Sequence, residues 1–345
     1  MKTGVLVVVA VIFGAAGCAS PQNDTATLDC SSPANPCADW SAVDRKYAAR
    51  DPSLFGDVVR ARELLDSWFG KGQHLLDAAE LLENVLRKDS EFAPAFLEYG
   101  RLFQKAALIT NREYDLERLA EARTWIFKAI EIEPDYVDAF IILSSTYINA
   151  GRHAEARAAL ARAEAMGSDD PGIEINHAVM LRREGQDDAA LERYERVIEQ
   201  GKKADPAYAV ASGMMANIYS DQGRYEEAKA AHELKLEVEP ESAWNWGGYS
   251  RFLIFRYGDV DGAIASARKA LSIMNYGDGR FVLACALFTK WALMVEETGD
   301  TEATQAVFDE AIGLYPDVER IIQMTGAHEP TKVAATQLAR WMQTR

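Results

Sequence analysis

The sequence has few of the side chains that build catalytic and metal sites. Its 345 residues include only five histidines and four cysteines, and the histidines are scattered along the chain. It contains no H-E-x-x-H, no G-x-S-x-G and no G-x-x-x-x-G-K-S/T, the patterns that place metal ligands, a nucleophile or phosphate-binding amides at a fixed spacing. The sequence therefore predicts a protein that is not an enzyme, with no cofactor and no metal site.

Positive charge is also scarce. The chain has 53 acidic and 37 basic residues, a formal net charge of −16. Nucleic acids and anionic lipid surfaces are both bound mainly through Lys and Arg, which neutralise phosphates. The composition predicts no nucleic-acid partner and no electrostatic adhesion to a membrane.

Long apolar runs are absent except near the N-terminus, where Val5 to Phe13 follows Lys2. This run is too short to span a bilayer and is typical of a secretion signal. The residues that follow, AAGC up to Cys18, resemble the bacterial lipobox, with Ala15 in place of the usual Leu. The resemblance implies a signal peptide over 1–17, a lipid on Cys18 and, because Ala19 follows, an outer-membrane location facing the periplasm. The alternative is ordinary cleavage after Ala19, which leaves no lipid.

Residues 18–53 are rich in Ser, Pro, Asn, Asp and Thr and have no apolar periodicity, which predicts a flexible tether. Within it Cys30 and Cys37 bound the short loop CSSPANPC. Export to an oxidising compartment favours a disulfide between them. A metal site is the alternative, although no His or further Cys lies nearby. Cys285 stands in an apolar helical run and is predicted to be a small buried core residue.

Residues 137–204 divide after Asp170 into two blocks of equal length. Each has Gly at its fifteenth position (Gly151, Gly185) and Ala at its twentieth (Ala156, Ala190). Gly allows the chain to leave a helix in a left-handed conformation, and Ala allows two helices to approach closely. A large apolar residue follows four positions later and a small one three after that: Leu160 and Tyr194, then Ala163 and Val197. The 34-residue period resembles the tetratricopeptide repeat, a helix–turn–helix unit.

The same pattern recurs on both sides of these blocks. The resemblance predicts an all-α solenoid of about seven to eight helical hairpins over 54–316, with capping helices over 317–345. His177 and His232 fall on core positions of the repeat, which favours packing over metal binding. One departure is an insertion over 104–121, between Phe103 and Ala122. It is either loop growth or helix extension, or a lip that contacts a partner.

In this family the first helix of each hairpin lines a groove that binds partners, usually peptides. The Lys and Asn side chains with which some members clamp a C-terminal carboxylate are not matched, since Leu97, Arg101, Ile141 and Ser145 stand there. A helix or an extended apolar peptide is the expected occupant. The alternative is that several apolar members of the set pack on a neighbouring helix. By position, the groove residues are Arg101, Lys105, Ile141, Ile142, Ser145, Asn149, Asn176, Val179, Arg182, Arg183, Met214, Asn217, Asp221, Trp244, Arg251 and Phe255.

Two functional hypotheses follow. The first is an outer-membrane-anchored periplasmic scaffold or adaptor that binds a protein or peptide of the cell envelope, with its lipid as the only membrane contact. The second is a lipoprotein associated with solute transport, which self-associates as a homo-oligomer and binds a small apolar ligand. Trp, Phe and Met residues in the later repeats support the second hypothesis. The fold is common to both.

Overall fold

The computed structural model describes residues 40–344 except 69, 111–112 and 202–205. The predicted signal peptide, the lipid on Cys18 and the disulfide between Cys30 and Cys37 lie outside the described residues. Within the described ranges, no helix combines the length and the apolar character needed to cross a membrane. The chain divides into two compact units, one ending at Asn176 and the other beginning at His177.

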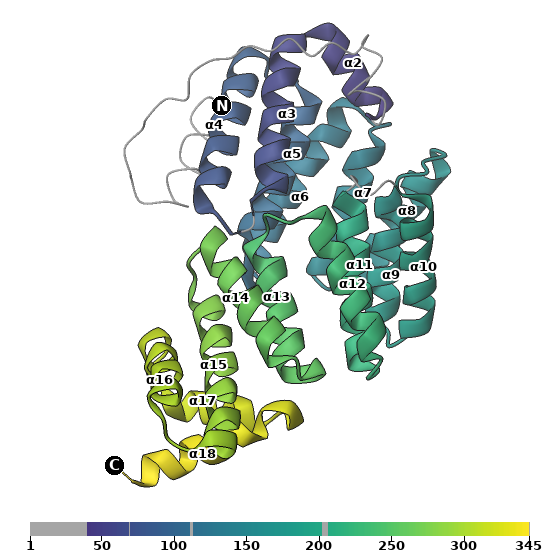
Figure 1. Cartoon of the computed structure of the whole chain (residues 1–345). Helices are drawn as coiled ribbons and strands as arrows, with labels where there is room; N and C mark the ends of the chain where they lie inside the picture. Colours follow the sequence, from purple (N-terminus) through teal and green to yellow (C-terminus); the bar gives the residue numbers. More distant parts are fainter. Residues whose placement is uncertain (1–39, 69, 111–112, 202–205, 345) are drawn as a thin grey trace. The chain divides into compact units, whose positions relative to one another are not determined.

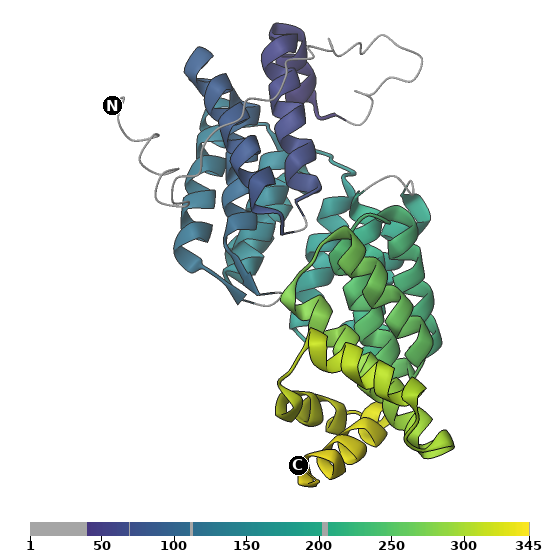
Figure 2. The same ribbon diagram turned by 60° about the vertical axis from the view of Figure 1, so that its left-hand side comes forward.

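The first unit is a series of helical hairpins preceded by one short helix (Figure 1). Neighbouring hairpins are in contact along the series, and Figure 2 shows the purple to teal helices of this unit standing side by side. Its helices are α2 (Ala42–Arg50), α3 (Pro52–Asp66), α4 (Gly72–Lys88), α5 (Ala93–Ala106), α6 (Leu116–Ile132), α7 (Val137–Asn149) and α8 (His153–Ala165), and α9 (Pro171–Arg183) begins in this unit.

The second unit continues the hairpins and ends in two terminal helices. A π-helical turn, η1 (Leu253–Tyr257), extends α13 (Ala243–Phe252), and a 3-10 turn, η2 (Glu329–Thr331), precedes the last helix. Its helices after α9 are α10 (Asp187–Gln200), α11 (Pro206–Asp221), α12 (Tyr225–Val238), α13 (Ala243–Phe252), α14 (Val260–Ile273), α15 (Gly277–Thr298), α16 (Glu302–Leu314), α17 (Val318–Gly326) and α18 (Lys332–Gln343).

The turns and seams of the repeats follow the sequence pattern. Gly151 and Gly185 have φ of +72° and +77°, the left-handed conformation that ends the first helix of a hairpin. The Ala and large apolar positions of both blocks are fully buried between helices, as at Ala156, Leu160 and Ala190. The all-α, repeat-type fold predicted from the sequence is therefore confirmed.

The structure differs from the predicted tether over residues 42–53, which are helical. Ser41 caps α2 by accepting a hydrogen bond from the backbone N–H of Asp44, and Asp51 caps α3 in the same way. Val43 and Tyr47 of α2 are buried. The apolar residues in this stretch are few and are separated by charged ones, so the sequence pattern does not predict a helix there.

The insertion between Phe103 and Ala122 forms a small antiparallel hairpin, β1 (Leu108–Thr110) and β2 (Glu113–Tyr114). Neither loop growth nor helix extension describes these residues fully, and the alternative that they form a lip contacting a partner stays a prediction. α6 begins after the hairpin, capped by the side chain of Asp115. Ile109 in β1 is 60% exposed.

In the second unit, α15 is the central helix. Residues 281–289 are buried all round, because α13, α14, α16 and both terminal helices contact α15. Cys285 is among them, a buried free thiol, which confirms its predicted core position. The terminal helices are present as predicted, and Leu338 of α18 is fully buried.

Candidate functional site

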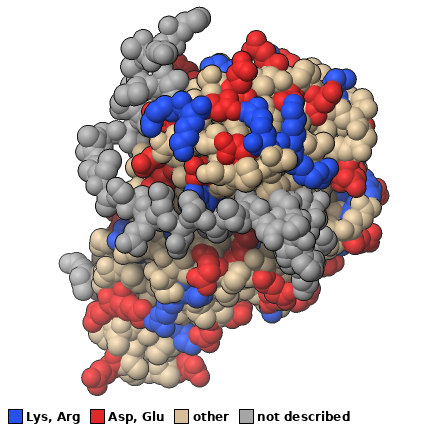
Figure 3. Space-filling model, turned by 90° about the horizontal axis from the view of Figure 1, so that it is seen from above, with Lys and Arg blue, Asp and Glu red and all other residues tan. Residues whose placement is uncertain are grey.

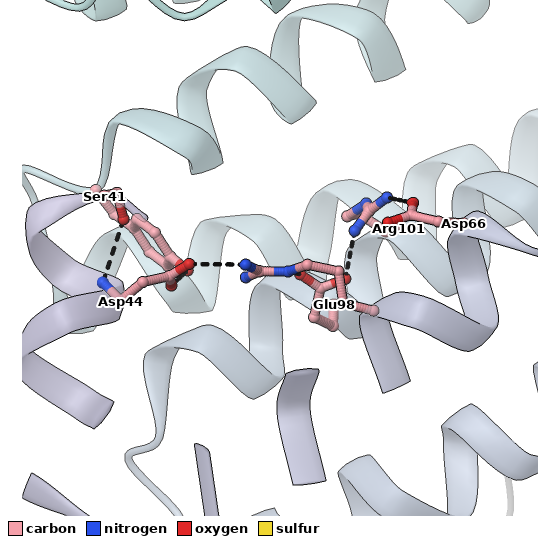
Figure 4. A network of polar contacts seen from close by, with 7 residues as sticks. Ser41, Asp44, Asp66, Glu98 and Arg101 are labelled. Carbon is pink, nitrogen blue, oxygen red and sulfur yellow. Dashed lines mark hydrogen bonds and ion pairs between the residues drawn. The ribbon is translucent and has the colours of Figure 1, made fainter. Parts of the chain in front are cut away.

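A chain of ion pairs crosses the first-helix face of the first unit, the surface formed by α3, α5 and α7 (Figure 4). Arg62 of α3 lies between two carboxylates: its Nη1 is 2.9 Å from Asp44 Oδ2 and its Nε is 2.8 Å from Glu98 Oε1. The other oxygen of Glu98 accepts a hydrogen bond from Arg101, which also pairs with Asp66. Asp44 and Glu98 are each 1% exposed, so these charges are neutralised inside the protein rather than by water.

The network reaches the start of α7 through a tyrosine. Tyr136 is fully buried, and its hydroxyl donates to Asp44 Oδ1 over 2.5 Å. Burial, followed by the charge of Asp44, raises the pKa of Tyr136 well above its usual value. Burial by itself lowers the pKa of Arg62, but Glu98 and Asp44 more than offset this, so its pKa is raised. Both donors therefore keep their protons wherever the protein is folded.

Asp138 of α7 lies beside this network, where a negative charge on its carboxyl group is unfavourable. Its pKa is raised to about 7, first by burial and then by the charge of Asp44. Asp170 raises it further, whereas Arg62 and a hydrogen bond with Ser41 lower it. The acidic residues here outnumber the arginines, so Asp138 takes up a proton near neutral pH.

The predicted groove residues of the first unit divide into a partly exposed group and a buried group. Arg101, Lys105, Ile142, Ser145 and Asn149 are partly exposed on first helices. Arg101 belongs to the ion network, and Ser145 accepts a hydrogen bond of 2.8 Å from Gln104.

Ile141 and Asn176 do not line a surface, in contrast to the prediction. They are 6% and 7% exposed. Asn176 Nδ2 donates to the Ile141 carbonyl and to Ser144 Oγ, at 3.1 and 2.7 Å. The two side chains lie between α7 and α9. For Ile141 this agrees with the alternative stated above, in which apolar groove positions pack on a neighbouring helix.

In the second unit the structure brings three predicted residues together. Arg182 of α9 pairs with Asp221 of α11 at 3.1 Å and lies 3.8 Å from the sulfur of Met214. Val179 and Met214 are partly exposed, and Arg183 and Asn217 are exposed. Adjacent first helices thus present charged, polar and apolar groups on one surface, which we call the α9–α11 surface (Val179, Arg182, Met214, Asn217 and Asp221).

The predicted groove residues of α13 and η1 lie in three different surroundings. Trp244 is 44% exposed and its ring lies against that of Tyr276 in a tilted arrangement, with ring centroids 4.7 Å apart. Arg251 pairs with Asp278. Phe255 is only 4% exposed, because the ring of His328 lies against it at 4.9 Å. The η2 segment contacts η1 here and removes Phe255 from the surface. The prediction that Phe255 lines the groove is therefore wrong, because the C-terminal segment folds back over it.

The residues at the centre of the ion network are not among the predicted site residues. Arg62 stands in α3 between the buried residues Val58 and Leu65, and Glu98 stands in the apolar run APAFLEYG. A charged residue inside an apolar stripe is a signal for a buried ion pair, because an unpaired charge there is strongly unfavourable. Asp44 lay in the supposed tether and was not considered.

His232 packs against aromatic rings, as its position in the repeat predicts. The His232 ring lies 5.0 Å from that of Phe252, and burial, then the charge of Lys235, lowers its pKa to about 4. His232 is thus a neutral packing residue at neutral pH. Among the residues that the structure describes, no group of three His, Cys, Asp or Glu could hold a metal ion.

Comparisons with known proteins agree with this architecture. Residues 170–237, which include the α9–α11 surface, match the tetratricopeptide repeat family. A search of curated proteins finds no match to the sequence.

Two solved structures with similar folds are a Cut9–Hcn1 hetero-tetramer of the APC/C and a human IFIT1 dimer with PPP-AAAA. The first is 13% identical, covers 86% of this chain and 51% of its own, and has a TM-score of 0.52. The second is 16% identical, covers 88% and 67%, and has a TM-score of 0.53. This chain spans about half the length of the first. Such identities establish the fold alone: this chain is an all-α helical-repeat protein, and its residues 170–237 match the tetratricopeptide repeat.

Proposed function

We propose that the protein is a non-catalytic scaffold or adaptor that binds a protein or peptide partner on the α9–α11 surface. The observation that supports it best is the grouping of Arg182, Met214 and Asp221 from two adjacent first helices. Such a surface offers apolar contact area next to charged groups, which is what an amphipathic segment of a partner requires. The tetratricopeptide match covers the same helices.

We also propose that the protein acts at the cell envelope, anchored by a lipid on Cys18 to the outer membrane and facing the periplasm. The lipobox-like residues before Cys18 support this part of the proposal. Wild-type protein expressed in a bacterium with an outer membrane is expected to sediment with the outer-membrane fraction. Cys18→Ser should move most of it to the soluble periplasmic fraction, because it removes the acyl attachment point. Equal membrane recovery of both proteins would contradict the anchor.

The binding surface can be tested by crosslinked pull-down from solubilised envelopes. Val179→Glu combined with Met214→Glu places two charges in the α9–α11 surface and should reduce recovery of the partner at least tenfold, since partner contacts would be desolvated there. Ala265→Glu, an exposed change on α14, is the matched control and should leave recovery unchanged. If all three proteins recover the same partner equally, the α9–α11 surface is not the binding site.

A second candidate function is binding of a small apolar ligand with self-association. Trp244 supports it, since the residue is 44% exposed and its ring lies in tilted contact with that of Tyr276. In the same pull-down this function predicts recovery of the protein itself, together with a bound small molecule and no foreign protein.

A further inference from the structure

The helix α2 does not belong to a helical hairpin. A single residue, Asp51, joins it to α3 and serves both as the C-cap of α2 and as the N-cap of α3. α2 lies against α3 and α5 (Figure 1), two helices that form the first-helix face of this unit. α2 therefore covers part of the face on which this type of repeat binds partners.

The polar centre of the α2 contact is a recess that holds one carboxylate. Arg62 of α3 and the hydroxyl of Tyr136, just before α7, both donate to Asp44 of α2, at 2.9 and 2.5 Å. Neither donor is on α2, so the hairpins themselves build the recess and α2 only fills it. Charge-assisted donors at these distances select a carboxylate over a neutral group.

Apart from Asp44, α2 has few buried contacts. Only Val43 and Tyr47 are buried as well, and Tyr47 packs edge-on against Phe92 at 4.8 Å. A nine-residue helix is too short to be stable by itself, so it is helical only while docked. A buried ion pair stabilises weakly once the cost of desolvation is included. The Tyr47 hydroxyl also donates to the Glu91 carbonyl at 3.2 Å and to Glu133 Oε1 at 3.0 Å. The docked state is thus held by a small apolar contact, one replaceable carboxylate and polar contacts at the edge of the helix.

We propose that α2 is a displaceable cover of the first-helix face, and that a partner helix with an acidic residue, followed one turn later by an aromatic residue, takes its place. The pair Asp44 and Tyr47 has this spacing and shows which side chains the face accepts. The inference goes beyond the proposed function, because it concerns a face of the first unit and names the chemical class of partner that this face accepts.

The surroundings of Asp138 make the cover sensitive to pH. The groups around the Asp138 carboxylate are Asp44 and Ser41 from the α2 segment, Arg62 from α3, Tyr136 and Asp170. Burial, then Asp44, raises the pKa of Asp138 to about 7 in the docked state. Release of α2 removes Asp44 and admits water, which lowers this pKa. The docked state binds the proton more tightly, so docking is weakened as the pH rises through about 7.

Two ion pairs at the edge of α2 make the cover sensitive to salt as well. Lys46 pairs with Glu133 at 2.6 Å, and Arg50 pairs with Asp89. Figure 3, which looks down on the molecule from above, shows basic side chains standing among acidic ones. Salt screens such surface pairs, so it should favour release.

Hydrogen exchange of the full chain tests the cover without a partner. Amides of 42–50 should exchange at least tenfold faster than those of α3 and α5, and the difference should grow severalfold between pH 6 and pH 8 after correction for intrinsic rates. Asp138→Asn should remove this pH dependence, because the amide stays neutral. Exchange of α2 at the same rate as α3 and α5 at both pH values would overturn the proposal.

A peptide tests the chemistry of the recess. The probe is a labelled synthetic peptide, WSAVDRKYAARD, which repeats residues 40–51. It is added to full-length protein carrying Asp44→Ala and Tyr47→Ala, which weaken the internal helix. The peptide should bind this variant, and the version with Asn in place of its first Asp should bind at least tenfold more weakly. Thermal denaturation followed by circular dichroism checks that the variant is folded. If the variant is unfolded, the hydrogen-exchange experiment on the wild-type chain tests the proposal instead.

The outcomes separate this inference from the proposed function. If the two peptides bind equally, or neither binds to a folded variant, the carboxylate recess is not a binding site, whatever the pull-down shows. If the pull-down fails and the peptide binds as expected, the α9–α11 surface is rejected while the displaceable cover stands.

Discussion

Replacing Arg62 by Leu is expected to lower the free energy of unfolding of the first unit by about 3–5 kcal/mol, the range for breaking a buried ion pair by removing one partner. Arg62 neutralises two carboxylates, Asp44 and Glu98, that are each 1% exposed. Leu fills the space but leaves both acids without this cation. Arg101 still pairs with Glu98, so we expect the loss to be at the lower end of the range.

Urea denaturation followed by circular dichroism at 222 nm measures this effect. The matched control is Arg60→Leu on the same helix, since Arg60 pairs with Asp57 at the surface and is 41% exposed. Surface pairs contribute about 0–1 kcal/mol, so the control should change little. A loss below that of the control would show that the network does not stabilise the unit.

Replacing Gly100 by Val is expected to lower the free energy of unfolding by about 3 kcal/mol, the upper part of the range for overpacking a core. A Cβ at this position of α5 would lie 2.4 Å from Ile126 Cγ1 and 3.2 Å from the Ala122 carbonyl oxygen of α6. Since the second of these atoms is backbone, the helices of the hairpin must separate. The physical reason for glycine here is therefore close helix packing.

Gly248→Ala is the control for this prediction. Gly248 is exposed in the middle of α13, and a Cβ there meets no atom within 4 Å. Alanine costs less backbone entropy than glycine in a helix, so the control should gain about 0.5–1 kcal/mol. Thermal and urea denaturation of both variants measures the change in the free energy of unfolding, which should be a loss for Gly100→Val and a gain for Gly248→Ala. A stabilised Gly100→Val protein would mean that α5 and α6 are not as close as the structure shows.

Much of the candidate site depends on contacts that no local pattern encodes. Arg182, Met214 and Asp221 could be selected as surface residues because repeat positions determine which face of a first helix is free. The same rule failed for Phe255, Ile141 and Asn176. Phe255 is covered by His328, which lies 73 residues later, and the other two pack against the neighbouring helix. Position within a repeat gives the direction of a side chain, and other segments of the chain decide what covers it.

The sequence by itself determined the architecture. A 34-residue period with Gly at the turn and Ala at the seam specifies a helical hairpin from local interactions, so Gly151 and Ala156 could be placed before the structure was known. Only the tertiary structure revealed α2 as a packed helix and joined Asp44, Arg62, Glu98 and Tyr136 into one network. These four residues are spread over more than ninety positions of the sequence. A buried charge is stable only beside its partner, and which residues become partners depends on how the hairpins and α2 pack, a long-range property that periodicity does not contain.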